Sequence, residues 1–129
     1  MKWLPLILAA VALPAKAEDV IVPSGQPVQF VEMLHDANGT EGLTIRFRFL
    51  APQIARDTGW VSIDAALEDI DHLCSSYAVP RLSGMQPMPE QIVISLMDRL
   101  VEFGTANPDA TQFFEAYRIE NGSCIWEGL

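Results

Sequence analysis

Residues 43–49 alternate strictly between apolar and polar side chains, and this pattern constrains the fold more than any other in the chain. A period of two is typical of a β-strand that has one face on a core. Residues 28–35 also read as a strand, and the polar loop between the two segments predicts a hairpin. The inner face of the second strand is expected to hold Leu43, Ile45, Phe47 and Phe49, with Thr44, Arg46 and Arg48 on the other face.

An amphipathic helix is predicted over Ser62–Tyr77, and Ser62 suits the N-cap position. The apolar positions recur at helical spacing and are Ile63, Ala66, Leu67, Ile70, Leu73, Cys74 and Tyr77. The opposite side of the helix carries Asp64, Glu68, Asp71 and His72. The helix is therefore expected to rest on the sheet with Cys74 pointing inward.

The middle of the chain gives two weaker signals. Residues 78–89 contain three prolines and a glycine, which predict an irregular loop. Residues 90–103 are compatible with a helix or a strand, because charged side chains cluster on a helical wheel while Ile92-Val93-Ile94 is a β-branched run. We favour a strand from Ile92 to Met97, followed by a second short strand.

The last segments predict a short helix and a final hairpin. Asn107-Pro108 is a good helix start, and Ala110, Phe113, Phe114 and Tyr117 have helical spacing. Asn121-Gly122 lies between apolar runs and is a strong hairpin signal, which places Cys124 on the last strand. The predicted fold is α+β: a mostly antiparallel sheet, one main amphipathic helix packed across it, and a disulfide from the helix to the last strand.

The first 17 residues read as a secretory signal peptide. Lys2 precedes an apolar run from Trp3 to Leu13, and Ala15-Lys16-Ala17 gives the small-x-small pattern before Glu18. The apolar run is shorter than the ~20 residues that a helix needs to cross a bilayer. We therefore expect cleavage near Ala17, a single α+β domain over residues 18–129, and a location in the periplasm or outside the cell.

The two cysteines, Cys74 and Cys124, are expected to form a disulfide, because an exported chain meets an oxidising compartment and each has no other partner. In the chain-entropy description, closing this loop stabilises the fold by about 4 kcal/mol. A redox pair or a metal site is a poorer fit, since the chain has no C-x-x-C motif and the two sulfurs lack ligand spacing.

The net negative charge of the chain disfavours some classes of binding partner. The chain has 17 acidic and 8 basic residues, and two of the basic ones, Lys2 and Lys16, lie in the predicted signal peptide. Residues 18–129 therefore carry a formal charge of −11, which disfavours nucleic acid and anionic membrane surfaces. A basic protein partner, a small ligand or a cation fits better, although acidic charge can also serve solubility alone.

Two groups of side chains are candidates for binding. Asp64, Glu68 and His72 share one helix face, and the i, i+4 spacing of the last two can hold a metal ion; a solvated helix face is the structural alternative. Arg46 and Arg48 could grip a carboxylate or phosphate of a ligand or partner, or pair across the hairpin with Glu32 or another neighbouring acid.

Other candidates carry weaker signals. Met85 and Met88 form a soft copper(I) motif without a nearby histidine; they could instead cap the edge of the core or line a flexible loop. The sequence has no nucleophile elbow, and the histidines offer only His35-Asp36 and Asp71-His72 as acid–base pairs. Five aromatic residues could form a partner patch, although most of them are expected to pack in the core: Trp60, Trp126, Phe113, Phe114 and Tyr117.

The C-terminal segment Asp109–Glu127 resembles small exported proteins of alphaproteobacteria that form a family of unknown function. The resemblance implies a periplasmic setting and no activity. Similar sequences sometimes carry the label acetolactate synthase, but a thiamine-diphosphate enzyme needs large α/β domains to hold its cofactor, and 112 residues cannot supply them. No cofactor is expected.

These observations favour an exported acidic interaction or binding module over an enzyme. Small size, acidic charge and an oxidising compartment occur together without a catalytic constellation. The alternatives are a small periplasmic metal-binding protein and, with less support, a small hydrolase. The sequence leaves the ligand and the oligomeric state open.

Overall fold

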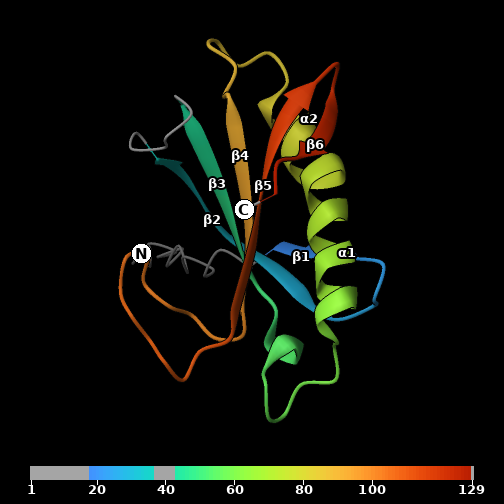
Figure 1. Ribbon diagram of the computed structural model, residues 1–129, viewed down its shortest axis with the longest axis vertical. Coiled ribbons are helices and arrows are strands. Elements are labelled where there is room, and N and C mark those ends of the chain that lie inside the picture. Colours follow the sequence, from blue (N-terminus) through green and yellow to red (C-terminus); the bar gives the residue numbers. More distant parts are fainter. Residues whose placement is uncertain (1–17, 37–42, 129) are drawn as a thin grey trace, which may run out of the picture.

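The computed structural model describes residues 18–36 and 43–128. Within them, six strands form one sheet, and their order across the sheet is the same as their order in the sequence (Figure 1). The helical segments follow the third strand and precede the fourth in the sequence. The strands are β1 (Glu18–Val20), β2 (Val28–Asp36), β3 (Thr44–Leu50), β4 (Gln91–Met97), β5 (Gln112–Glu120) and β6 (Ser123–Trp126). The helical segments are η1 (Pro52–Ile54), α1 (Ile63–Leu73), η2 (Cys74–Ala78) and α2 (Val79–Leu82).

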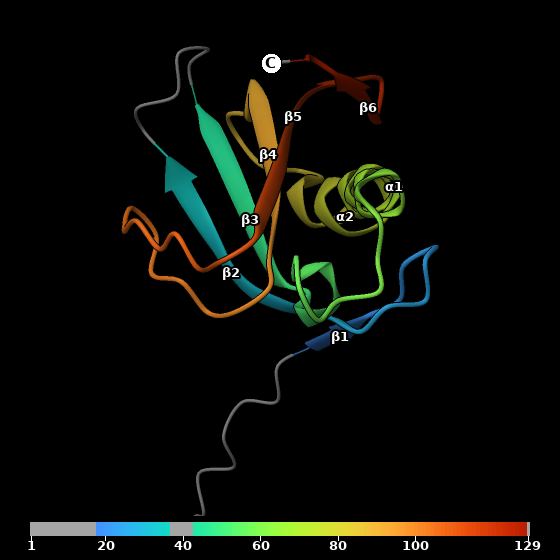
Figure 2. The ribbon, with the colours of Figure 1, turned by 60° about the horizontal axis from the view of Figure 1, so that its bottom comes forward.

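All neighbouring strands pair antiparallel except β3 and β4, which are parallel. A parallel pair needs a crossover, and the helical segments provide it on one face of the sheet (Figure 2). The predicted α+β architecture, a mostly antiparallel sheet with one main helix, is therefore confirmed. No helix of the described residues is long and apolar enough to span a membrane.

The predicted hairpin is formed by β2 and β3, with Met33 opposite Phe47. Ile45, Phe47 and Phe49 are fully buried against the helical layer, as their alternation indicated. The other face of β3 is also covered, since Thr44 and Arg48 are buried. The connection between β4 and β5 lies over that second face, where Val101 and Ala110 pack with Met97.

The main helix begins where the sequence predicts. The Ser62 Oγ accepts a hydrogen bond from the backbone N–H of Ala65, and Ile70 and Leu73 on the inner side of α1 are buried. The segment then continues through η2 and α2 to Leu82, so the prediction of an irregular loop from residue 78 is wrong at its start. Pro80 lies in α2, directly after the π-helical turn η2.

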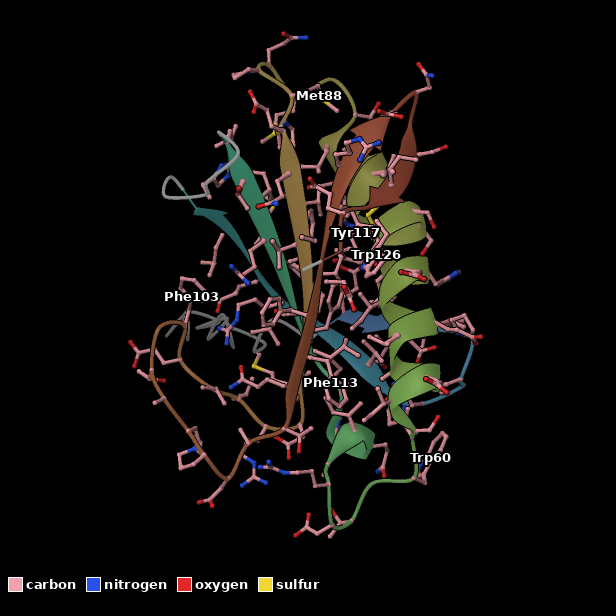
Figure 3. All side chains as sticks on the ribbon, viewed as in Figure 1. Trp60, Met88, Phe103, Phe113, Tyr117 and Trp126 are labelled. Carbon is pink, nitrogen blue, oxygen red and sulfur yellow. A yellow bond between two sulfur atoms is a disulfide. The ribbon has the colours of Figure 1, made fainter. Side chains whose placement is uncertain are left out.

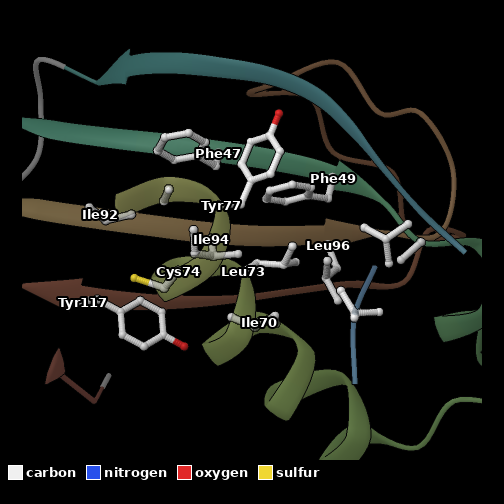
Figure 4. Packing of buried hydrophobic residues seen from close by; sticks show 14 of the residues in the cluster. Phe47, Phe49, Ile70, Leu73, Cys74, Tyr77, Ile92, Ile94, Leu96 and Tyr117 are labelled. Atoms are coloured by element: carbon white, nitrogen blue, oxygen red, sulfur yellow. The ribbon is translucent and has the colours of Figure 1, made fainter. Parts of the chain in front are cut away.

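The core lies between the sheet and the helical layer (Figure 4). Its largest group is aromatic: the Tyr77 ring lies 5.1 Å from Phe30, 5.2 Å from Phe49 and 6.1 Å from Phe47, centroid to centroid. Each pair of this size contributes on the order of 1 kcal/mol beyond its area burial. Ile70, on α1, packs into the same cluster.

The predicted disulfide is confirmed. Cys74, at the end of α1, is bonded to Cys124 on β6, with a Cα–Cα distance of 6.3 Å. The β5–β6 turn follows the prediction as well, because Asn121 and Gly122 both have positive φ, at 52° and 77°. Positive φ at both central residues gives the turn the twist that joins two antiparallel strands.

Two predictions for the last third of the chain are wrong. The strand over Ile92–Met97 is confirmed as part of β4, but no second strand follows it, and residues 98–111 form an irregular connection. The short helix predicted from Asn107 is absent there, because residues 112–120 form β5 and pair with β4. Tyr117 packs toward the helices while Ala116 is buried on the other face, so pairing with β4 overrides the helical spacing.

A buried carboxylate joins the first turn of the chain to the main helix. Asp69 on α1 is fully buried and accepts hydrogen bonds from three donors of the β1–β2 turn. These donors are the Ser24 backbone N–H at 2.9 Å, the Ser24 hydroxyl at 2.6 Å and the Gln26 amide at 2.8 Å. Through Asp69, the short strand β1 is held against the rest of the domain.

Candidate binding cavity

A cavity of about 540 Å³ lies between the segment that leads into α1 and the beginning of β5. Most of its lining is apolar, and the polar lining groups are hydroxyls, a side-chain amide and one guanidinium. The lining comprises Ile54, Ala55, Arg56, Gly59, Val61, Ser62, Ile63, Ala110, Thr111, Gln112 and Phe113. Groups of these kinds hold a ligand by apolar contact and a few hydrogen bonds.

One wall of the cavity is a tight loop between η1 and α1. The Gly59 N–H donates to the Ala55 carbonyl at 3.0 Å, and the Val61 N–H donates to the Gln53 carbonyl at 3.0 Å. Gly59 approaches this backbone so closely that a Cβ on it would lie 2.1 Å from the Gln53 carbonyl oxygen. Only glycine fits at this position, which explains why the loop carries one there.

Arg56 fastens this loop to the opposite wall. Its guanidinium donates to the Pro108 carbonyl at 2.8 Å and to the Ala110 carbonyl at 3.3 Å. Its backbone N–H donates to the Thr111 hydroxyl at 3.2 Å. Three contacts from one residue thus hold the two walls at a fixed separation.

Asp98 holds the second wall from the side of β4. Its carboxylate accepts from the Thr111 N–H at 3.0 Å, and its own N–H donates to the Thr111 carbonyl at 3.0 Å. Burial by itself raises the pKa of Asp98, but hydrogen bonds from Arg99 and from the Thr111 N–H outweigh it and lower this pKa below its ordinary value. The group is therefore a charged acceptor at neutral pH.

Exposed apolar side chains flank the cavity. Trp60 and Ile63 are each 61% exposed; Ile63 belongs to the lining, and Trp60 lies between the lining residues Gly59 and Val61 in the chain. In Figure 3, Phe113 lies on the lower half of β5 and Trp60 lies at the lower end of α1. Large apolar side chains kept in water beside a cavity are typical of a binding surface.

Arg46 and Arg48 lie on the other face of the sheet, away from this cavity. Arg48 pairs with Glu32 at 2.5 Å and donates to the Val101 carbonyl at 2.6 Å, so its predicted pairing across the hairpin is confirmed. Phe103 covers both arginines, 5.1 Å from Arg46 and 5.6 Å from Arg48. A ligand at these arginines stays a prediction.

Asp64 and Glu68 are exposed on the outer side of α1, and His72 is half-buried there. Across the described residues, no group of three or more His, Cys, Asp or Glu side chains is arranged to hold a metal ion. The metal site at Asp64, Glu68 and His72 stays a prediction. Met85 packs against the core and Met88 is exposed.

The acid–base candidates are also dispersed. His35 is exposed near the end of β2, and the side chain of Asp36 lies outside the part of the structure that is described. Asp71 accepts a hydrogen bond from the Tyr117 hydroxyl, and burial, followed by this bond, raises the pKa of Tyr117. The phenol thus remains protonated at neutral pH and serves as a structural donor.

Sequence reasoning did not find the cavity. Its walls come from residues 54–63 and 110–113, which no motif connects. The available signals were Gly59-Trp60, a glycine beside a large aromatic residue, and the aromatic group that included Phe113. Of that group, Trp60, Phe114 and Trp126 are exposed, whereas Tyr117 is buried.

Comparisons with known proteins identify the family but no activity. No curated protein and no solved structure matches the chain. A family of unknown function, DUF6497, is matched over residues 6–129, which is nearly the whole chain. The chain belongs to this family.

Proposed function

We propose that this protein is an exported binding protein that holds an apolar group of its ligand or partner in the cavity between the η1–α1 loop and β5. The cavity itself is the observation that carries the proposal. Its volume of about 540 Å³ lies within the roughly 300–1,000 Å³ that small-molecule sites occupy. A largely apolar lining with a few polar groups is the usual composition of such sites.

The hydrogen bonds of both walls support a site that is formed before a ligand arrives. Arg56 joins the two walls, and Asp98 holds the start of β5. A preformed cavity loses little conformational entropy when it binds, so more of the contact free energy contributes to affinity. Trp60 and Ile63, exposed beside the opening, would add apolar contact area.

Export is supported by the disulfide between Cys74 and Cys124, because such bonds persist in oxidising compartments. The signal-peptide pattern of residues 1–17 agrees with this. The formal charge of −11 over residues 18–129 favours a partner with basic groups and disfavours nucleic acid and anionic membranes. The mature protein would therefore act in the periplasm or outside the cell.

The test uses the fluorescent dye anilinonaphthalene sulfonate, whose apolar rings and anionic group match the apolar lining and Arg56. Ala55→Trp places a large side chain at the cavity, while Ala106→Trp adds the same bulk to an exposed position that does not line it. We expect the unmodified protein and Ala106→Trp to bind the dye equally and Ala55→Trp to bind at least tenfold more weakly, with all three folded by circular dichroism. Equal binding by Ala55→Trp, or no saturable binding by the unmodified protein, would overturn the proposal.

A further inference from the structure

On the side of β5 that faces β6, only about half of the strand is paired with another strand. β6 pairs with residues 117–120, and the Glu127 N–H extends this pairing to the Ala116 carbonyl. On the other side, β4 pairs with the strand down to Gln112. Among the described residues, no strand pairs with positions 112–115 on the β6 side.

The pairing pattern shows which backbone groups lie on this open edge. The Asp98 N–H donates to the Thr111 carbonyl, so Thr111 faces β4, whereas the Ala116 carbonyl faces β6. Successive residues of a strand direct their N–H and C=O groups to alternate sides. Gln112 and Phe114 therefore direct both groups away from β4 and toward the open edge.

The same stretch borders the cavity. Gln112 and Phe113 belong to its lining, and Val61 and Ile63 face them from the α1 side. Phe113 lies opposite Leu96, whose side chain is buried on the helical face of the sheet. A strand added beside residues 112–115 would thus direct alternate side chains into the cavity.

We infer that the partner is an extended polypeptide segment that adds to the open edge of β5. Its backbone would bond to the N–H and C=O groups of Gln112 and Phe114, and one of its apolar side chains would enter the cavity. Strand addition of this kind takes affinity from main-chain hydrogen bonds and specificity from pockets for alternate side chains. This inference rests on the proposed function, because it assigns the occupant of the same cavity.

The charge of the protein selects among such segments. Residues 18–129 carry a formal charge of −11, and Glu115 and Asp64 lie on the two elements that border the site. Complementary charge speeds encounter and suppresses wrong partners. The segment is accordingly one that alternates apolar residues with lysine or arginine.

The probe is a display library of random twelve-residue peptides, selected on the protein purified after export from its host. We expect enriched peptides with apolar residues at alternate positions and basic residues between them. Amide hydrogen exchange of the free protein should be fast at Gln112 and Phe114 and slow at Phe113. The bound peptide should then protect the Gln112 and Phe114 amides.

Proline variants supply the matched comparison. Gln112→Pro removes an outward N–H at the first residue of β5, where proline is tolerated, and Phe114→Pro removes the next one. Gln112→Ala and Phe114→Ala change the same side chains and keep the N–H groups. We expect each proline to weaken peptide binding about tenfold, the effect of one main-chain hydrogen bond, and each alanine to weaken it far less.

The outcomes separate this inference from the proposed function. Suppose that Ala55→Trp abolishes peptide binding, but the proline variants bind as tightly as the unmodified protein and the peptide does not slow exchange of the Gln112 and Phe114 amides. That result would overturn strand addition and leave the cavity proposal standing. Failure to enrich any peptide while the dye still binds in the cavity would do the same. If the protein without peptide is a dimer and its Gln112 and Phe114 amides exchange slowly, a second copy of the chain occupies the open edge of β5. That result would overturn the inference.

Discussion

Replacing Asp69 by alanine should strongly destabilise this protein, because it removes a buried acceptor that joins α1 to the β1–β2 turn. Asp69 is fully buried and accepts three hydrogen bonds, from the Ser24 N–H, the Ser24 hydroxyl and the Gln26 amide. Hydrogen bonds to charged groups contribute about 1.5–3 kcal/mol each, and their effects overlap when the donors share one acceptor. Removing the carboxylate also leaves the buried side-chain amide of Gln26 without its acceptor.

We expect Asp69→Ala to lower the free energy of unfolding by about 4 kcal/mol. The melting temperature should fall by about 15 °C. Urea titration followed by circular dichroism measures the loss, with the disulfide kept oxidised in every sample. Glu68→Ala is the matched control, because Glu68 is the exposed neighbour on the same helix, and its effect should stay within about 0.5 kcal/mol. A loss below about 1 kcal/mol for Asp69→Ala would refute the assigned role of this carboxylate as the anchor of the β1–β2 turn.

Three further predictions concern the disulfide, the buried phenol and the cavity loop. Replacing both Cys74 and Cys124 by alanine should lower the free energy of unfolding by about 4 kcal/mol in urea titrations; a loss under about 1 kcal/mol would contradict this. Because burial and hydrogen bonding raise the pKa of Tyr117, its contribution to stability is complete below the ordinary tyrosine pKa of about 10 and is lost as the pH rises above it. Residues 18–129 contain no lysine, so lysine titration does not overlap with that of tyrosine. The free energy of unfolding measured from about pH 8 to 11 should show this decline, and Tyr117→Phe should make the decline smaller. An identical decline in the variant would contradict the role given to Tyr117. Gly59→Ala should cost about 1–3 kcal/mol and weaken dye binding, because its Cβ would meet the Gln53 carbonyl oxygen; wild-type stability would show that the loop adjusts freely.

The sequence was sufficient where local pattern and tertiary environment agree. The alternation over residues 43–49 identified β3 and its inner face, and the helical spacing after Ser62 identified α1 with its cap. Asn121-Gly122 identified the final hairpin, because both residues adopt the positive φ that its turn requires. The expectation of an oxidising compartment was sufficient to predict the disulfide between Cys74 and Cys124.

The sequence was misleading where contacts distant in the chain decide the conformation. Residues 112–120 have apolar residues at helical spacing, yet they form a strand, because β4 offers them a complete antiparallel partner. That strand is covered on both faces over part of its length, with Tyr117 on one side and Ala116 on the other, so it shows no clean alternation. The spacing of apolar residues within a segment carries no information about a pairing strand, such as β4, that comes from elsewhere in the chain.

The cavity could not be predicted for a related reason. Residues 54–63 and 110–113 meet only because β4 and β5 place Met97 opposite Gln112, and because Arg56 then bonds across to the Pro108 and Ala110 carbonyls. None of these contacts leaves a periodic signal. The arginine that joins the walls was not among the candidates, whereas Arg48, which was, is bonded within the domain.

Mapping dye binding by nuclear magnetic resonance on isotope-labelled protein tests the binding cavity most directly. We expect anilinonaphthalene sulfonate to shift backbone amide signals within residues 54–63 and 110–113, which form the walls of the cavity, and to leave the signals around His72 and Arg46 in place. Shifts centred on the outer side of α1 or on the arginine-bearing face of the sheet, with the cavity residues unmoved, would contradict it.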